Sequence, residues 1–124
     1  MKSTGPSSSV VEAILERAQY SCEACGSLVG DRRGEDWSVQ HRLPRRMGGT
    51  RWRGVNLPSN LMILCGSAVT GCHGFAESKR AAALAAGWLL SSNPDPTTTP
   101  ALVCKRWVLL TNEATYKEVG RVDA

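Results

Sequence analysis

The chain has 124 residues, which corresponds to one domain with a modest hydrophobic core. Its longest apolar run, residues 81–90, is too short to cross a membrane, and the polar start over residues 1–9 predicts no secretory signal, so we expect a soluble, cytoplasmic protein. The net charge of +4 comes mostly from arginine, the residue best suited to bidentate phosphate contacts, which favours a nucleic-acid partner.

Small and polar residues fill positions 1–8, for which we expect a disordered tail. A helix is predicted from Ser9 to about Tyr20. Ser9 and Glu12 fit a capping box there, and apolar residues recur at helical spacing behind them. This helix opens the main domain, which we place at residues 9–90.

Two short strands and a second helix are predicted in the middle of the chain. The first strand covers residues 37–39 and carries Gln40 and His41 at or just beyond its end. The apolar run at residues 61–64 is the second strand. A helix then follows from about residue 74 to residue 86, which gives the order strand, loop, strand, helix.

The last third of the chain divides into a linker and a hairpin. Residues 91–100 are rich in proline and small polar residues, which is typical of a linker without a core of its own. Strand-forming residues follow, so residues 101–124 are predicted to form a β-hairpin packed on the domain. Cys104 falls in the first strand of this hairpin, where we expect it to be a small buried apolar residue.

The spacing of the other four cysteines predicts one metal site. Cys22 and Cys25 form a C-x-x-C pair, whose thiolates can both reach one tetrahedral ion at roughly 2.3 Å. Cys65 and Cys72 supply the second pair, so these four thiolates are predicted to bind a structural zinc ion. An odd number of cysteines without a signal sequence favours this arrangement over disulfides.

His73 directly follows the predicted ligand Cys72. Neighbouring side chains diverge, so one small ion could not easily take both, and His73 is then free to face a different site. In an alternative arrangement, His73 joins three of the cysteines on the zinc ion and Cys72 is merely buried.

Four segments between residues 22 and 78 carry these cysteines together with both histidines, and they read CEACG, QHRLPRRMGG, NLPSNLMILC and GCHGFAES. Together they resemble the HNH endonuclease family, in particular its small phage-encoded members. The second cysteine pair departs from the family pattern, because it reads C-x6-C-H where the family has C-x-x-C-H. The resemblance implies an α+β fold, in which a ββα-metal module is stapled by the four-cysteine zinc site and flanked by the N-terminal helix and the C-terminal β-hairpin.

The resemblance also implies roles for three residues. His41 would be the general base that activates water, because a neutral imidazole can take a proton near neutral pH. Asn60 would hold the loop that positions His41, and His73 would bind a catalytic divalent ion, which could be Mg²⁺, Mn²⁺, Ni²⁺ or Zn²⁺. The implied reaction is hydrolysis of DNA phosphodiester bonds to a 5′-phosphate and a 3′-hydroxyl. Many phage relatives act beside the terminase, so the resemblance suggests terminase subunits as partners of a monomeric protein.

Two residues compete as the further ligand of the catalytic ion. The family usually has Asp or His at the position of Gln40, whose neutral amide alone with His73 would hold a cation weakly. Glu77 lies four residues after His73 on the predicted helix, so its carboxylate can reach the same ion. In the alternative, Glu77 is an exposed helix residue that pairs with Arg80.

Seven arginines lie between residues 32 and 53, where only two acidic residues oppose them, and the local charge of +5 is typical of a nucleic-acid groove. The predicted DNA contacts are Arg42, Arg45, Arg46, Arg51, Trp52 and Arg53. A solvated charged loop is the alternative for this cluster, and a place in the core is the alternative for Trp52. If the HNH positions have decayed, the chain would instead be a non-catalytic zinc module that binds nucleic acid.

Overall fold

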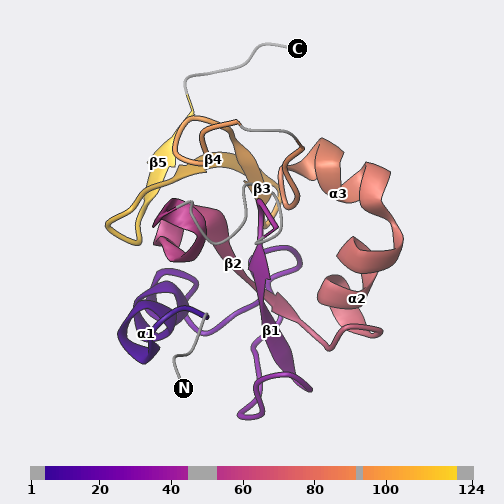
Figure 1. The fold of residues 1–124 in the computed structure, drawn as a ribbon. Coiled ribbons are helices and arrows are strands. Elements are labelled where there is room, and N and C mark those ends of the chain that lie inside the picture. The colour runs from indigo at the N-terminus through magenta and orange to yellow at the C-terminus, as the bar shows by residue number, and fades with distance from the viewer. Residues whose placement is uncertain (1–4, 45–52, 92–93, 120–124) are drawn as a thin grey trace.

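The computed structural model describes residues 5–44, 53–91 and 94–119, and its fold is mixed α+β, as predicted (Figure 1). In chain order, the elements are α1 (Ser8–Arg17), β1 (Trp37–His41), the 3-10 helices η2 (Arg53–Asn56) and η3 (Pro58–Asn60), β2 (Leu61–Cys65), α2 (Gly71–Ser78), α3 (Arg80–Ala86), β3 (Ala101–Val103), β4 (Arg106–Leu110) and β5 (Tyr116–Glu118). Within the described ranges, no helix is long and apolar enough to span a membrane.

The first helix begins and ends earlier than predicted. Ser7 is its N-cap and accepts the Val10 N–H at 3.3 Å, so the predicted capping box from Ser9 does not form. Ser8 already belongs to α1, which shortens the predicted tail of residues 1–8. The helix stops at Arg17, because the chain soon enters the left-handed region at Gln19, whose φ is 55°.

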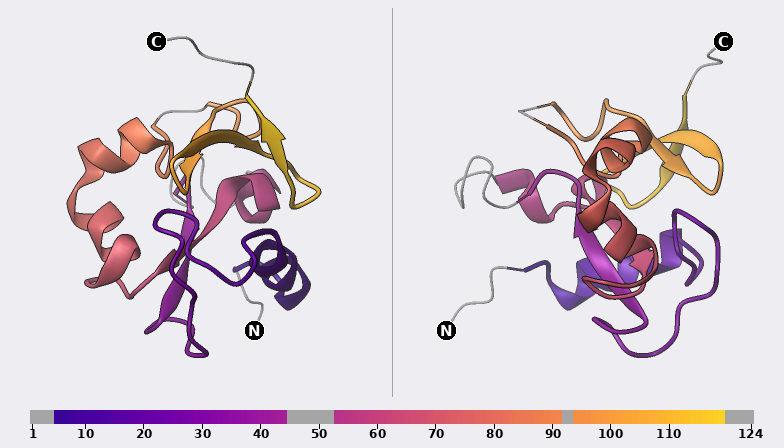
Figure 2. Two further views of the ribbon diagram at one scale, coloured as in Figure 1. Left: turned by 180° about the vertical axis from the view of Figure 1, so that it is seen from behind. Right: turned by 90° about the vertical axis from the view of Figure 1, so that its right-hand side faces the viewer.

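The strands form two separate antiparallel sheets. β1 pairs with β2, with Trp37 opposite Cys65 and His41 opposite Leu61, so both strands reach one or two residues further than predicted. β3, β4 and β5 form a three-stranded sheet, where a hairpin was predicted. In Figures 1 and 2, α1 lies on one side of the β1–β2 pair and α2 and α3 lie on the other.

The prediction for Cys104 is wrong. This residue is exposed and lies in the two-residue turn between β3 and β4, where its φ is 48° and that of Lys105 is 71°. Hairpin turns of type I′ have positive φ at both central residues, as here, and such turns lie at the surface. The turn also lies beside the cysteine loop, because the Cys104 N–H donates to the Glu23 carbonyl at 2.9 Å.

The helix predicted from residue 74 to residue 86 is two helices. α2 ends at Ser78 and α3 begins at Arg80, and Lys79 between them has φ −116° and ψ 66°, outside the helical region. The residues around the break are ordinary helix formers, so residue type gives no warning of it. α3 therefore takes a different direction from α2 (Figure 1).

β2 separates two hydrophobic clusters, because its side chains alternate between the two faces of the sheet. Leu61 and Ile63 pack with α1 and with Trp37 of β1. Met62 and Leu64 face the other way, into a cluster that includes residues of α2, α3, β3 and β4. The C-terminal sheet therefore shares its core with the rest of the domain.

A buried ion pair joins the N-terminal helix to the cysteine loop. Arg17 donates from Nε and Nη2 to the two carboxylate oxygens of Glu23, at 2.9 and 2.7 Å. The same carboxylate accepts hydrogen bonds from the Ile63 N–H and from the Tyr116 hydroxyl. This network connects α1, β2 and β5 around Glu23, which lies between the first two cysteines of the predicted metal site.

Candidate metal centre and the adjoining polar pocket

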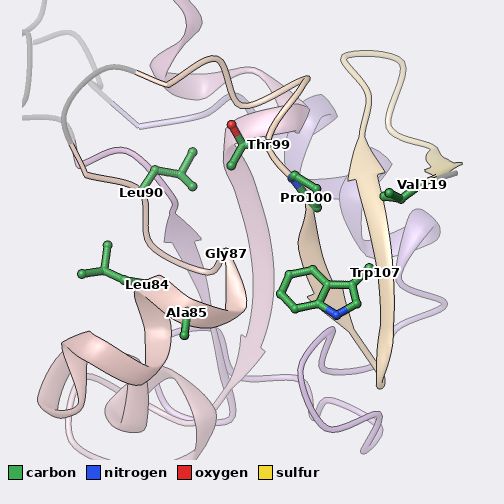
Figure 3. A pocket seen from close by; sticks show the side chains of 8 residues that line it. All are labelled: Leu84, Ala85, Gly87, Leu90, Thr99, Pro100, Trp107 and Val119. Carbon is green, nitrogen blue, oxygen red and sulfur yellow. The ribbon is translucent and has the colours of Figure 1, made fainter. Parts of the chain in front are cut away.

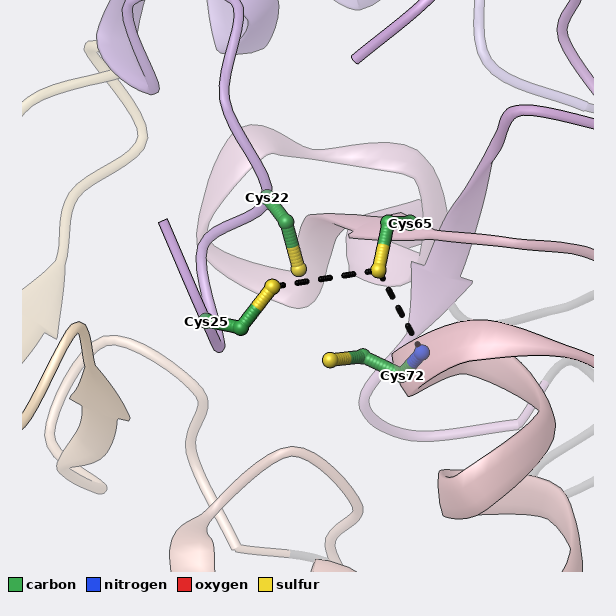
Figure 4. A group of neighbouring side chains, drawn as sticks. All are labelled: Cys22, Cys25, Cys65 and Cys72. Carbon is green, nitrogen blue, oxygen red and sulfur yellow. Dashed lines mark hydrogen bonds between the residues drawn. The ribbon is translucent and has the colours of Figure 1, made fainter. Parts of the chain in front are cut away.

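The four predicted cysteine ligands come together, and their sulfur atoms all lie within 4.8 Å of one another (Figure 4). Cys22 and Cys25 follow α1, Cys65 ends β2 and Cys72 lies in the first turn of α2. The sulfurs of Cys25 and Cys65 are 3.8 Å apart. A tetrahedral ion with metal–sulfur bonds of roughly 2.3 Å requires sulfur–sulfur distances of roughly 3.8 Å, so the group could hold one metal ion.

The long spacing between Cys65 and Cys72 is accommodated by a loop that folds back on itself. Gly66 and Gly71 stand at its two ends, and both have positive φ, 92° and 63°. A Cβ at Gly66 would lie 2.1 Å from the Thr70 carbonyl oxygen, so only glycine allows this approach. The loop brings the Cys72 N–H to 3.4 Å from the Cys65 sulfur, which places both thiols at the same centre.

The surroundings of the thiols differ in their effect on ionisation. Burial raises the pKa of the Cys22 thiol and that of the Cys72 thiol. Burial acts in the same direction on Cys25, but hydrogen bonds from the hydroxyl and backbone of Ser27 outweigh it and lower the Cys25 pKa to about 7. Because metal ions bind thiolates, a metal that enters this centre must displace protons from the thiols.

His73 turns away from the cysteine cluster. Its Nδ1 lies 3.1 Å from the Ser67 carbonyl oxygen, and because a carbonyl oxygen only accepts, Nδ1 carries the ring proton. In the neutral ring, Nε2 is then the nitrogen whose lone pair can bind a metal. Within the described residues, the group that could hold a metal contains the four cysteines without His73, which does not support the alternative zinc site.

A polar cavity of about 540 Å³ lies beside the four-cysteine cluster, because it is lined by His73, the neighbour of Cys72. It is lined by residues of β1, α2 and the segments around them: Val39, Gln40, His41, Pro44, His73, Glu77, Arg80 and Leu89. Four polar residues that were singled out in the sequence therefore line one cavity, although they come from two separate segments. Cys72 and His73 are neighbours on α2, so the metal centre and the cavity share the beginning of this helix.

Two asparagines hold the chain around His41. The His41 Nε2 lies 2.8 Å from the Asn56 Oδ1, so Nε2 is the donor and Nδ1 is the nitrogen that can accept a proton. Asn60 is fully buried and bonds to the backbone of Leu43 and Val55. Asn56 was not predicted, because its contact with His41 depends on the turn of η2 and no sequence spacing indicates it.

The two candidate ligands Gln40 and Glu77 differ in exposure. Gln40 is only 4% exposed, and its Nε2 donates to the Trp88 carbonyl at 3.1 Å, which leaves the side-chain oxygen as the atom suited to a cation. Glu77 is exposed, as expected if it is a surface residue of the helix and not a metal ligand. Among the described residues, however, no ion pair joins Glu77 to Arg80, because the helix is interrupted between them.

The prediction that Arg42 contacts DNA is wrong, because its side chain is fully buried. The guanidinium instead donates to five backbone carbonyls, those of Ser59, Gly87, Pro96, Thr99 and Pro100. Burial, with the charge of Arg17, lowers the Arg42 pKa to about 10, so the group remains charged at neutral pH. Three carbonyls of the segment predicted as a linker, those of Pro96, Thr99 and Pro100, are thus held against the domain. The other predicted DNA contacts, Arg45, Arg46, Arg51, Trp52 and the side chain of Arg53, lie outside what the structure describes.

A second cavity, of about 560 Å³, is apolar (Figure 3). Leu84 of α3 and Trp107 of β4 line it and are 40% and 46% exposed. Its remaining lining residues are Ala85, Gly87, Leu90, Thr99, Pro100 and Val119. Since no side chain in this set ionises near neutral pH or binds metals well, chemistry is expected in the polar cavity.

No protein-family model, no characterised protein and no solved structure matches this chain. The function must therefore be inferred from the two features of the site. One is a four-cysteine centre that could hold a metal, and the other is a polar cavity with two histidines, an amide, a carboxylate and a guanidinium.

Proposed function

We propose that this protein is a zinc-stabilised HNH endonuclease, which hydrolyses DNA phosphodiester bonds with the help of a divalent cation. The observation that carries this proposal is the polar cavity, in which His41 of β1 faces the same space as His73 of α2. The order β1, β2, α2, with a thiol cluster that connects β2 to α2, supports the ββα-metal module that the sequence resemblance implies.

The structural role belongs to the four cysteines. A zinc ion held by Cys65 and Cys72 would fix the end of β2 to the start of α2, and Cys22 and Cys25 would add the loop after α1. Because His73 directly follows Cys72, this ion would also fix the position of His73 relative to β1. The four-thiolate set is closed, as is typical of structural rather than catalytic zinc.

The catalytic role belongs to the residues of the cavity. His41 would take a proton from the attacking water through Nδ1, while Asn56 holds its Nε2 and Asn60 fixes the backbone nearby. His73 Nε2, the Gln40 oxygen and the Glu77 carboxylate would hold a divalent cation, and this ligand set of one nitrogen and oxygens suits Mn²⁺ or Mg²⁺. When bound, the cation would act as a Lewis acid that stabilises negative charge on the leaving 3′-oxygen.

The test is cleavage of supercoiled plasmid by the purified protein with Mg²⁺, Mn²⁺ or Ni²⁺, with and without EDTA. We expect nicked and linear products that EDTA suppresses. His41→Ala should cut on the order of 100-fold more slowly and still bind DNA, because the base is lost and the charged surface is kept. Arg106→Ala, at the start of β4 in the C-terminal sheet, is the control and should cut at the wild-type rate.

A non-catalytic zinc module that binds nucleic acid is the second candidate, and the neutral Gln40 at a position where the family has a stronger ligand favours it. DNA binding without cleavage under every metal would establish this candidate and overturn the nuclease. An undiminished rate in His41→Ala would show that His41 is not the base.

A further inference from the structure

We infer that Arg80 binds the phosphate of the substrate inside the polar cavity, an inference that rests on the proposed nuclease function. Arg80 lines the cavity together with His41, His73 and Glu77. Its side chain is exposed, and among the described residues it forms no hydrogen bond and no ion pair. The guanidinium is therefore available to a ligand that enters the cavity.

The break between α2 and α3 explains why the Arg80 side chain forms no ion pair with Glu77. In a continuous helix, Glu77 and Arg80 would stand three residues apart on one face, where opposite charges pair. Lys79 leaves the helical conformation between them, and α3 starts anew at Arg80. As a result, the carboxylate and the guanidinium line the same cavity without an ion pair between them.

The chemistry of a phosphodiester matches this arrangement. A guanidinium can donate two parallel hydrogen bonds to the non-bridging oxygens of one phosphate, which fixes the phosphate in orientation as well as in position. The Glu77 carboxylate, by contrast, would repel a phosphate unless a cation lies between them. Arg80 would therefore orient the phosphate for attack by the water that His41 activates, and it would offset charge that develops during hydrolysis.

The first measurement is DNA binding with Mn²⁺ in the His41→Ala background, where cleavage is slow and both the zinc ion and the cation beside Glu77 stay in place. The affinity of a labelled duplex is measured by fluorescence anisotropy over a range of salt concentrations. Loss of one phosphate contact should reduce the slope of log affinity against log salt by about 0.9, so we expect this reduction in Arg80→Ala and not in Arg80→Lys.

Arg106→Ala is the matched control, because it removes the same charge from a side chain that is 70% exposed and lies 3.7 Å from Glu118, on the C-terminal sheet. It should keep the slope of the His41→Ala parent. If Arg106→Ala lowers the slope as much as Arg80→Ala does, the effect is one of overall charge and the inference is overturned.

The second measurement is plasmid cleavage with Mn²⁺. We expect Arg80→Ala to lower kcat on the order of 100-fold with a smaller change in KM, and Arg80→Lys to recover part of the loss. Affinity for Mn²⁺, measured by calorimetry, should stay at the wild-type value, because Arg80 is not a ligand of the cation.

The two measurements separate this inference from the proposed nuclease. If the wild-type protein does not cleave but Arg80→Ala still loses one phosphate contact in the binding measurement, the nuclease proposal fails and the phosphate contact stands. If the wild-type protein cleaves and Arg80→Ala matches it in both salt slope and kcat, the nuclease stands and the role of Arg80 is refuted.

Discussion

Asn60 holds the backbone of Leu43 with both ends of its side-chain amide. Oδ1 accepts the Leu43 N–H at 2.8 Å, and Nδ2 donates to the Leu43 carbonyl at 3.1 Å. Nδ2 also donates to the Val55 carbonyl at 2.9 Å, and the whole side chain is buried. The residue thus ties the chain just after His41 to η2, which carries Asn56, the hydrogen-bond partner of His41.

Asn60→Asp should destabilise the fold. A carboxylate can still accept the Leu43 N–H, but it cannot donate to the two carbonyls, which would then be left unpaired beside a buried charge. We expect a loss of about 3 kcal/mol in the free energy of unfolding, measured with urea. Asn112→Asp is the control: this residue is exposed and its Oδ1 only accepts, from the Ser59 N–H, so its stability should stay near wild type. Equal stability of the two variants would contradict the role of Asn60.

One zinc ion should be bound by the four cysteines. Cys65→Ser removes a thiolate with little change in size, so we expect the zinc content to fall well below one per chain and the cooperative unfolding transition to weaken. Cys104→Ser is the control, because Cys104 is not part of the cluster, and it should keep its zinc. Folded wild-type protein without zinc in elemental analysis would refute the site.

Zinc binding should release protons. Because burial raises the pKa of Cys22 and Cys72, these thiols are protonated at neutral pH before metal binds, whereas Cys25, with a pKa of about 7, is partly ionised. Calorimetric titrations of metal-stripped protein in buffers of different ionisation enthalpy should therefore show net proton release, and the affinity should fall as the pH is lowered. A pH-independent affinity would contradict the thiolate ligands.

Glu77 and Gln40 can be compared directly as ligands of the catalytic cation. Glu77→Ala should abolish metal-dependent cleavage and weaken Mn²⁺ binding in calorimetry, because it removes the one carboxylate among the described residues of the cavity, while the zinc content stays unchanged. Glu113→Ala, in the turn before β5, is the control for loss of an exposed acidic charge. Full activity in Glu77→Ala together with an inactive Gln40→Ala would assign the role to Gln40 alone.

The Tyr116 hydroxyl makes part of the stability pH-dependent. Burial, followed by the charge of Glu23, raises the Tyr116 pKa, because the neutral hydroxyl donates to the Glu23 carboxylate. A group whose pKa is raised on folding contributes stability that is present below its unfolded pKa, here about 10, and lost as the pH rises further. The difference in unfolding free energy between wild type and Tyr116→Phe should be constant up to about pH 9 and should shrink above pH 10. A constant difference at all pH values would rule out this linkage.

The features that the sequence predicted best are those determined by the spacing of neighbouring residues along the chain. The C-x-x-C pair and the second cysteine pair converge as expected, since a tetrahedral ion imposes nearly the same distances on any loop that can supply its ligands. β1 and β2 lie where apolar residues indicated strands, and they end one or two residues later. His41 and His73 were predicted to share a site, for which Gln40 and Glu77 competed as the further ligand, and all four line one cavity.

The errors have a different physical origin, because they depend on contacts between distant segments. Arg42 was taken for a surface arginine because of its neighbours in sequence, but its five acceptors are supplied by segments 17 to 58 residues away. The break at Lys79 and the contact between Asn56 and His41 likewise arise from tertiary structure. Cys104 was assigned to a strand because the turn that contains it lacks the glycine or asparagine that usually marks such turns.

The buried guanidinium of Arg42 also sets an order of assembly for the newly made chain. The last of its acceptors is the carbonyl of Pro100, and among the described residues it forms no ion pair, although the charge of buried Glu23 favours the guanidinium. A chain that ends at residue 91 would have to bury this charge with three of the five acceptors absent, at a cost of several kcal/mol. His41, the residue before Arg42, lines the polar cavity. This cavity should therefore form only after residue 100 has left the ribosome, so that shorter nascent chains lack a completed site.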